Sequence, residues 1–236
     1  MDTSKAQALD GVVAVFTAEH VAQSGIPGQV PVGWLLPDMK IPTRPLLAKD
    51  RVRYVGEAVA VVVAEDRYTA HDALELIDVE YEPLSAVANP AKAVEEGAPL
   101  VHDEAPNNIA FEWEIGDKEA TDQAFANAAH TVSLNLVNNR LIPNAVEPRA
   151  ALADYDPISG HLTLWMTTQN PHIHRLLMSL ASLGLPEHKI RVIAPEVGGG
   201  FGSKIHHYPD EAIISWCAMQ LGRPVKWQAT RLETLS

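Results

Sequence analysis

The C-terminal half of the chain repeats one pattern of hydrophobic and polar positions. Each of two units, Leu162–Pro186 and Ile190–Pro224, contains an apolar run of strand length, a polar or glycine-rich loop, a helix that begins at proline, and a Leu-Gly-x-Pro stop. Proline at the first helical position and glycine just past the last one is the usual polarity of helix ends. If the two strands lie parallel in one sheet, their loops leave the same edge, so we expect Gln169 to face Gly198–Gly202.

The strands of these units are predicted at Leu162–Met166 and Ile190–Ala194, and their helices begin at Pro171 and Pro209. In the first helix, apolar residues three and four positions apart form one stripe of the kind that faces a core. This stripe comprises Ile173, Leu176, Leu177 and Leu180, and it places His172, His174 and Arg175 on other faces.

The N-terminal part reads as a small α+β unit. Val52–Ala64 is rich in valine and predicts a buried strand, and Asp66 then caps a stretch with helical spacing of its apolar residues. Those residues are Ala70, Ala73, Leu74 and Ile77. Asp78–Glu82 predicts a return strand before Pro83.

The middle of the chain changes composition. Between about Leu84 and Asn108 the sequence is dense in alanine, proline and acidic residues, which is typical of a linker between domains. After it, Lys118–Ala129 predicts a helix and Thr131–Val137 predicts a strand.

Composition and charge narrow the function classes. A chain of 236 residues with 47 % hydrophobic and 20 % charged residues can form two modest globular domains. Its 18 Lys plus Arg against 30 Asp plus Glu give a net charge of −12, which argues against nucleic acid as a partner, because a phosphate backbone needs a basic footprint. Residues 1–6 lack a signal pattern, and no apolar run approaches the ~20 residues of a membrane span. We therefore expect a cytoplasmic protein without a membrane span.

Side chains that could bind metal are few. Cys217 is the single cysteine, so we expect neither an intrachain disulfide nor an iron–sulfur cluster held by this chain alone, because such clusters need several thiolates. Its apolar neighbours predict a small buried hydrophobe. His206 and His207 are adjacent, and their scatter with His172 and His174 matches no zinc pattern. We expect no metal held by protein side chains.

The octapeptide Val197–Lys204, Val-Gly-Gly-Gly-Phe-Gly-Ser-Lys, carries the strongest chemical signal. Glycine tolerates positive φ and has no Cβ, so such a loop can present consecutive main-chain N–H groups to an oxyanion or a metal-bound oxygen. The spacing fits neither a phosphate loop nor a dinucleotide fingerprint, since Ser203 and Ile205 stand where glycine or threonine would be needed. The alternative is a tight strand-to-helix turn whose glycines serve packing only.

The stretch Gly184–Val197 followed by Gly-Gly-Gly-Phe-Gly-Ser-Lys resembles the molybdenum-cofactor-binding large subunit of the xanthine dehydrogenase and aldehyde oxidase family. The sequence of this stretch is most similar to that of large chains of the aerobic carbon monoxide dehydrogenase type. Four further segments add to the resemblance, which spans nearly the entire chain: Tyr54–Ala60, Asn144–Arg149, Thr168–His172 and Pro224–Trp227.

This resemblance implies an α+β fold. It predicts a partial hammerhead-like α+β domain at residues 1–84, a linker at 85–116, and the first part of a mixed α/β molybdopterin-binding domain at 117–236. The site residues implied are Gln169, which would hydrogen-bond an oxygen on molybdenum, and Gly199, Gly200, Phe201 and Gly202, whose backbone would wrap the pterin. A carboxamide suits that task because it donates an N–H without adding charge.

The resemblance also implies cofactors and partners. We expect molybdenum-molybdopterin, in its cytosine dinucleotide form, at Gln169 and the glycine loop. Iron–sulfur clusters and FAD are expected on a small and a medium partner subunit, and they would carry electrons away after a small substrate such as an aldehyde or heterocycle is hydroxylated with water. Xanthine fits poorly, because Ile205 stands where xanthine-oxidising members have a glutamate.

The chain also departs from the family pattern. The family's large chain is roughly three times longer, and its catalytic glutamate has no counterpart before Ser236. A truncated gene product, a cloned fragment or one piece of a split subunit is expected, with the remaining part of the large subunit as a partner. Two classes of function stay open: part of a molybdenum hydroxylase, inactive without that remainder, or a non-catalytic remnant or docking module. A nucleotide-binding protein is a third.

Two charged residues beside the loop have open roles. Glu147 is expected to form an ordinary ion pair with Arg149 or Arg140. Lys204 either lies in solvent or helps to hold the loop, and its spacing does not decide between these roles.

Overall fold

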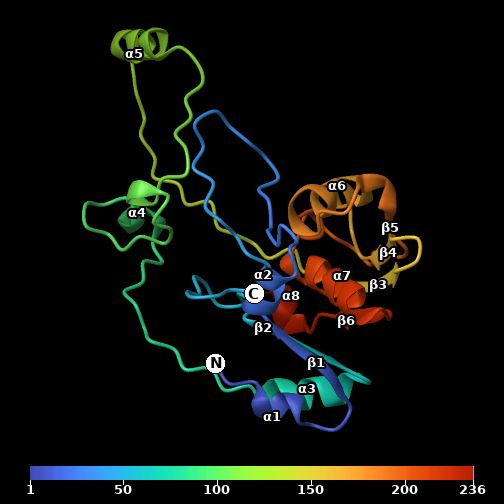
Figure 1. The fold of residues 1–236 in the computed structure, drawn as a ribbon. Coiled ribbons are helices and arrows are strands. Elements are labelled where there is room, and N and C mark those ends of the chain that lie inside the picture. The colour runs from blue at the N-terminus through green and yellow to red at the C-terminus, as the bar shows by residue number, and fades with distance from the viewer. Residues whose placement is uncertain (236) are drawn as a thin grey trace. The chain divides into compact units, whose positions relative to one another are not determined.

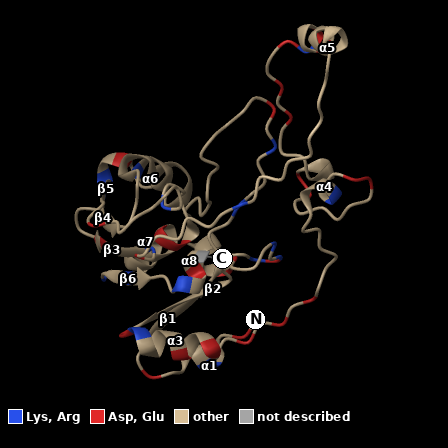
Figure 2. Cartoon of the chain, turned by 180° about the vertical axis from the view of Figure 1, so that it is seen from behind, with Lys and Arg blue, Asp and Glu red and all other residues tan. Residues whose placement is uncertain are grey.

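The computed structural model describes residues 1–235 and divides into two compact units (Figure 1). The first unit combines Met1–Trp34, Pro42–Ala86 and the chain from Pro143 onward. The second combines Leu35–Ile41 with Val87–Ile142. Acidic residues are spread over both units, with Lys and Arg interspersed (Figure 2). No described helix has the length and apolar character needed to cross a membrane.

A four-stranded sheet forms the centre of the first unit, with the order β5-β4-β3-β6. Its strands are β3 (Ala150–Asp156), β4 (His161–Met166), β5 (Ile190–Ile193) and β6 (Val225–Gln228). β3 pairs antiparallel with both β4 and β6, whereas β4 and β5 run parallel, in the register Leu162 opposite Ile190. The strands predicted at Leu162–Met166 and Ile190–Ala194, and their parallel arrangement, are therefore confirmed.

Two helices follow β4 and β5. α6 (Pro171–Leu177) continues through a π-helical turn, η2 (Met178–Ser182), and α7 (Pro209–Leu221) ends at Gly222, whose φ of 59° is the left-handed helix stop that the sequence predicted. A short 3-10 turn, η3 (Glu187–Lys189), precedes β5, and α8 (Arg231–Leu235) follows β6. α7 packs on the sheet at β3 and α6 packs beside β5.

The buried face of α6 differs from the prediction. The expected apolar stripe is largely exposed, with Ile173 at 47 % and Leu180 at 68 %, while His174 is 1 % exposed. The buried positions His174, Met178 and Ser182 recur every four residues on the inner face. Both polar side chains on this face contact other polar groups: His174 Nδ1 lies 3.4 Å from His207 Nδ1, and the Ser182 hydroxyl donates to the Gln29 carbonyl.

The N-terminal part of the first unit contains an antiparallel pair, β1 (Val12–Thr17) and β2 (Ala60–Ala64). α1 (Ser4–Gln7) and α3 (Arg67–Glu75) lie side by side along it, and α2 (Ala18–Gln23) follows β1 (Figure 1). Asp66 caps α3 as predicted, because its carboxylate accepts from the N–H groups of Tyr68 and Thr69.

Two N-terminal strand predictions need correction. The strand predicted over Val52–Ala64 is only β2, five residues long. The strand predicted at Asp78–Glu82 is wrong: it is reduced to one bridge, in which Asp78 and Asp2 exchange main-chain hydrogen bonds of 2.7 and 2.9 Å. A single bridge forms because Asp2 is followed almost at once by α1, which leaves no strand for residues 79–82 to join.

The core of the first unit joins its N-terminal part to α7. Trp216 of α7 is 1 % exposed, meets the Phe16 ring edge-on at 4.9 Å, and donates from its indole N–H to Ser24 Oγ. Cys217 beside it has no exposed surface, and burial raises its pKa to about 12, so the thiol is an inert part of the core, as predicted.

The second unit has little regular structure. It contains α4 (Pro90–Ala93), the 3-10 turn η1 (Pro106–Asn108) and α5 (Lys118–Asn127). α5 confirms the predicted helix Lys118–Ala129, two residues shorter at its end. The strand predicted at Thr131–Val137 is wrong, because this stretch pairs with no described strand and Val132, Leu134 and Leu136 are 76–86 % exposed.

Candidate functional site

The loops after β4 and β5 meet at one edge of the sheet because these strands are parallel. The main-chain N–H groups of Gly202 and Lys204 donate to Gln169 Oε1 over 3.1 and 3.2 Å. In return, the Gln169 N–H donates to the Lys204 carbonyl over 3.1 Å. The structure therefore confirms that Gln169 faces the glycine loop.

These contacts fix the orientation of the Gln169 carboxamide. Its oxygen accepts two main-chain N–H groups, so the amide nitrogen must point away from the loop backbone. In the described part of the chain Nε2 makes no hydrogen bond, and the residue is exposed at the surface. Gln169 thus presents an uncharged pair of N–H donors at a fixed position.

Backbone geometry requires the glycines at Val197–Lys204, each for a particular reason. Gly198, Gly199 and Gly202 have φ of 62°, 91° and 95°, which L side chains rarely adopt. Gly200 does not, but a Cβ there would lie 2.4 Å from Gln169 Oε1. Gly200 is therefore the position at which close approach of Gln169 excludes any side chain.

The loop is open to a ligand. In the chain described, the N–H groups of four consecutive residues, Gly198–Phe201, have no hydrogen-bond partner, and three of these residues are exposed. Phe201 has a positive φ of 49° and is 76 % exposed, so its ring does not fill the core. Strained backbone and unpaired consecutive donors are typical of a surface that binds an anion or an oxygen-rich group.

Lys204 holds the loop from beneath. The side chain is buried, and Nζ donates to the carbonyls of Val197 (2.5 Å) and Glu147 (2.9 Å). Of the two roles left open by the sequence, the structure shows the second. The ion pair expected for Glu147 is wrong, because Arg149 pairs with Asp210 and Glu211 instead, and the Glu147 side chain lies against Gly198.

Arg149 stands at the centre of a buried cluster behind the loop. Its Nη1 lies 2.9 Å from Asp210 Oδ2 and 3.2 Å from Glu211 Oε1, and its guanidinium lies 3.9 Å above the Tyr208 ring. The Tyr208 hydroxyl donates to the Ser203 carbonyl over 2.6 Å. The cluster therefore braces the C-terminal end of the glycine loop against α7.

Sequence reasoning missed this cluster. Asp210 and Glu211 lie in the first turn of α7, where the helix dipole alone would account for acidic residues. A signal was present, because Glu211 is followed by a run of apolar residues through Ile214, and an acid beside such a run needs a buried cation. Arg149, which lies 62 positions away, could not be identified as that cation from spacing.

We expect the Glu211→Gln substitution to flatten the pH dependence of stability. Burial raises the pKa of Glu211 from its ordinary 4.5 to about 7, against the opposing effect of Arg149. A carboxyl group whose pKa is raised by folding stabilises the folded state fully below about pH 4.5, and this contribution is lost as pH rises to about 7. The unfolding free energy of the wild type should therefore fall by about 3 kcal/mol over this window, whereas that of the variant should not. Urea unfolding at pH 5 and pH 8 measures it.

Comparing the wild type with Glu211→Gln removes the contribution of other titrating groups to the pH dependence of stability. Burial lowers the pKa of His174 to about 4 and that of His207 to about 3, and both histidines are the same in wild type and variant. Their contribution therefore cancels in the difference. Parallel stability profiles for wild type and Glu211→Gln would contradict the prediction.

The predicted histidines do not come together as a group of four. His174 and His207 are buried, and their Nδ1 atoms lie 3.4 Å apart, with His207 Nε2 at 2.7 Å from Ser182 Oγ. His172 and His206 are exposed. Burial keeps the inner pair neutral near pH 7, which suits a structural contact between loop and α6.

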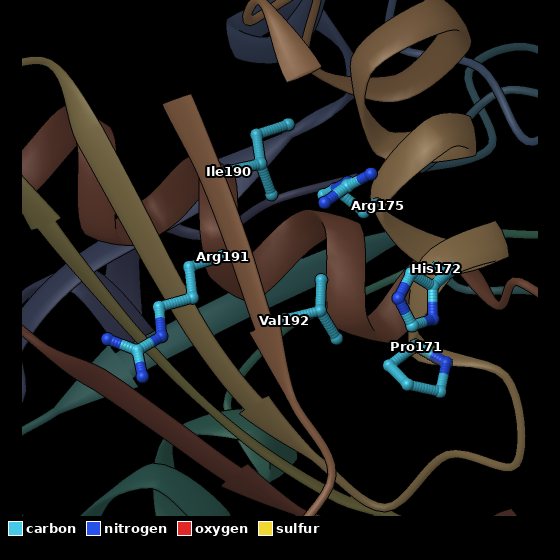
Figure 3. Close-up of a pocket in the computed structure, with 6 residues that line it drawn as sticks. All are labelled: Pro171, His172, Arg175, Ile190, Arg191 and Val192. Carbon is cyan, nitrogen blue, oxygen red and sulfur yellow. The ribbon is translucent and has the colours of Figure 1, made fainter. Parts of the chain in front are cut away.

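A small pocket of about 150 Å³ lies between α6 and β5 and does not include Gln169 or the glycine loop. Its lining residues are Pro171, His172, Arg175, Ile190, Arg191 and Val192 (Figure 3). Ile190 and Val192 project toward α6, whereas Arg191 points to the other side of the strand (Figure 3). Arg175 is paired with Glu187 at 2.6 Å, so its charge is already neutralised.

Comparison with family models gives two matches, one in each part of the chain. Residues 1–85 match the a/b hammerhead domain of aldehyde oxidase and xanthine dehydrogenase. Residues 101–236 match the molybdopterin cofactor-binding domain, which includes Gln169 and the whole glycine loop.

Individual relatives agree with these matches. The chain is 42 % identical to the carbon monoxide dehydrogenase large chain of Afipia carboxidovorans and 40 % identical to the nicotine 6-hydroxylase large subunit of Paenarthrobacter nicotinovorans, with all of this chain covered. Quinoline 2-oxidoreductase from Pseudomonas putida 86 superimposes with a TM-score of 0.90 at 36 % identity, covering 99 % of this chain and 29 % of that one. The chain spans about 30 % of the length of the two curated relatives, 30 % of the first and 28 % of the second.

Proposed function

This chain belongs to the aldehyde oxidase and xanthine dehydrogenase family of molybdopterin-binding proteins, and we propose that Gln169 and the glycine loop Gly198–Gly202 hold molybdopterin in a hydroxylase. The observation that carries the proposal is the set of unpaired donors at one edge of the sheet. Four consecutive loop N–H groups and the Gln169 amide nitrogen are all without a partner among residues 1–235.

The residues present fit this cofactor. Molybdopterin is anionic and rich in oxygen and sulfur acceptors, and main-chain N–H groups bind such atoms without a charged side chain. A Cβ at Gly200 would overlap Gln169, so the cradle exists only because that side chain is missing. The exposed Phe201 ring lies beside Gly199 and can cover a flat pterin face.

When bound, the cofactor supplies the two-electron oxidation of a small substrate with water as the oxygen source. The residues of this chain orient it. The loop N–H groups would hold its acceptors, and the Gln169 amide would donate a hydrogen bond to it from a position that Gly202 and Lys204 fix. Because these donors are ordered beforehand, they are available to charge that develops during the reaction.

The finer assignments belong to the same proposal. The resemblance to the carbon monoxide dehydrogenase type favours the cytosine dinucleotide form of the cofactor. Residues 1–236 contain one cysteine, so iron–sulfur clusters are assigned to a partner subunit. The family resemblance assigns FAD to another partner subunit and the rest of the substrate site to the remaining part of the large subunit. Relatives named for carbon monoxide, nicotine and quinoline point to a small molecule as substrate, and we place the complex in the cytoplasm.

The test is the complex purified with its partner polypeptides, in wild-type form and as Gln169→Glu. We expect molybdenum and pterin in stoichiometric amounts in the wild type. The carboxylate of the variant still accepts from Gly202 and Lys204 but has no N–H to donate, so turnover should fall by roughly 10²- to 10³-fold with the fold intact.

Gln220→Glu is the matched control, because it makes the same chemical change at an exposed position on α7. It should leave turnover and metal content unchanged. A wild-type complex without molybdenum would favour the docking module instead, and full turnover in Gln169→Glu would remove the role assigned to the amide.

A further inference from the structure

Lys204 joins the three segments that form the candidate site. Its main-chain N–H donates to Gln169 Oε1, and its carbonyl accepts from the Gln169 N–H and from Thr168 Oγ1 at 3.1 and 3.4 Å. Its side chain turns back to the carbonyls of Val197 and Glu147. One residue therefore ties the loop after β4, the start of the glycine loop and the Asn144–Arg149 segment together.

The ammonium of Lys204 is buried without an anionic contact. The residue is 2 % exposed, and within the described chain no carboxylate oxygen forms an ion pair with Nζ. The charges that face it are those of Glu147, Arg149 and Arg231, two of which are positive. Burial consequently lowers the pKa of Lys204, with Glu147 acting in the opposite direction.

Burying an ammonium group is energetically costly if its only role is to hold two carbonyl groups in place. Removing an ammonium from water is unfavourable, and two neutral carbonyls compensate for it less than a carboxylate would. A neutral donor could hold the same carbonyls at lower cost. The positive charge itself therefore has a use, and the unpaired N–H groups that follow Val197 in the loop indicate which one.

We propose that Lys204 is a positioning residue that holds Val197–Phe201 with its N–H groups outward and favours an anionic ligand there by its buried charge. The proposal rests on the proposed function and names a determinant of that same site. Donation from Nζ to the Val197 carbonyl polarises the Val197–Gly198 peptide, so the Gly198 N–H, first of the four unpaired donors, becomes a stronger donor.

The first test is cofactor content in the partner-bound complex with three substitutions. Lys204→Arg keeps the charge, Lys204→Gln keeps a neutral donor, and Lys204→Met keeps only the apolar stem. We expect molybdenum and pterin to fall roughly tenfold or more in the Gln and Met variants, and much less in the Arg variant. Equal retention in Lys204→Gln and Lys204→Arg would overturn the role of the charge.

The second test needs no cofactor. In the isolated full chain labelled with ¹⁵N-glycine, the Gly198 amide proton should move upfield in Lys204→Gln, while the Gly222 amide at the end of α7 stays in place. Lys226→Gln, on the exposed face of β6, is the matched control and should move neither signal. An unmoved Gly198 signal in folded Lys204→Gln overturns the inference.

The two tests separate the inference from the proposed function. If the wild-type complex carries no molybdenum but the Gly198 signal moves, the proposed function fails and the polarisation by Lys204 stands. If molybdenum is bound and the signal does not move, the inference fails alone.

Discussion

Replacing Gly200 with valine is expected to remove most of the bound molybdenum and pterin from the complex. The new Cβ would lie 2.4 Å from Gln169 Oε1 and 2.5 Å from its Cδ, which is far inside contact distance, so either the glutamine or the loop must move. Gln169 and the loop both provide hydrogen-bond donors to the candidate site. We expect cofactor content to fall by roughly tenfold or more, and unfolding free energy to fall by about 1–3 kcal/mol from the overlap. Metal analysis and urea unfolding measure the two effects.

Two further variants show whether the overlap with Gln169 is the cause. Gly33→Val is the matched control, because a Cβ at Gly33 meets nothing within 4 Å and its φ is not positive. In the double variant Gly200→Val with Gln169→Ala, the atoms that would overlap are gone, so part of the stability should recover while cofactor content stays low. Recovery is partial because the N–H groups of Gly202 and Lys204 lose Gln169 Oε1 as their acceptor. Wild-type cofactor content in Gly200→Val would show that the loop is not the binding site.

The second large effect is expected at Arg149, where methionine should cost about 3–5 kcal/mol of unfolding free energy. Arg149 is buried and is paired with Asp210 and Glu211, so its removal leaves Glu211 buried without a cation. Arg149 also lowers the pKa of Glu211, which should therefore rise further in the variant. Because a buried carboxylate is costly only when charged, the loss should be larger at pH 8 than at pH 5.

The control and the rescue for Arg149→Met are both available in the first unit. Arg223→Met, at an exposed position after α7, should change stability by no more than about 0.5 kcal/mol. Adding Glu211→Gln to Arg149→Met should restore part of the loss, because the uncompensated charge is then absent. A loss in Arg149→Met that does not depend on pH would mean that packing on Tyr208, and not charge, is what Arg149 contributes.

The meeting of Gln169 with the glycine loop could be predicted from the sequence because it depends on local signals for helices and strands. Pro171 and Pro209 set the helix starts, Gly184 and Gly222 set the stops, and the apolar runs between them set the strands. Once β4 and β5 are parallel neighbours, the meeting of Gln169 with the glycine loop follows from topology alone.

The features that could not be predicted from the sequence depend on contacts between residues far apart in the chain. The ion pair of Arg149 with Glu211 spans 62 positions, and periodicity carries no information about such pairs. On α6, the sequence showed the apolar stripe but not that Ser182 and His207 would satisfy each other on the opposite face. Thr131–Val137 has the alternation of a strand, yet a strand exists only with a neighbour to pair with.

The glycine loop is fastened at three points that involve no ligand. Lys204 holds the Val197 carbonyl, Gln169 holds the Gly202 N–H, and Tyr208 holds the Ser203 carbonyl. The conformational entropy of this glycine-rich stretch is therefore lost when the chain folds and not when a ligand binds. Ligand binding should then cost little conformational entropy and cause little rearrangement of the main chain, because the loop is preorganised.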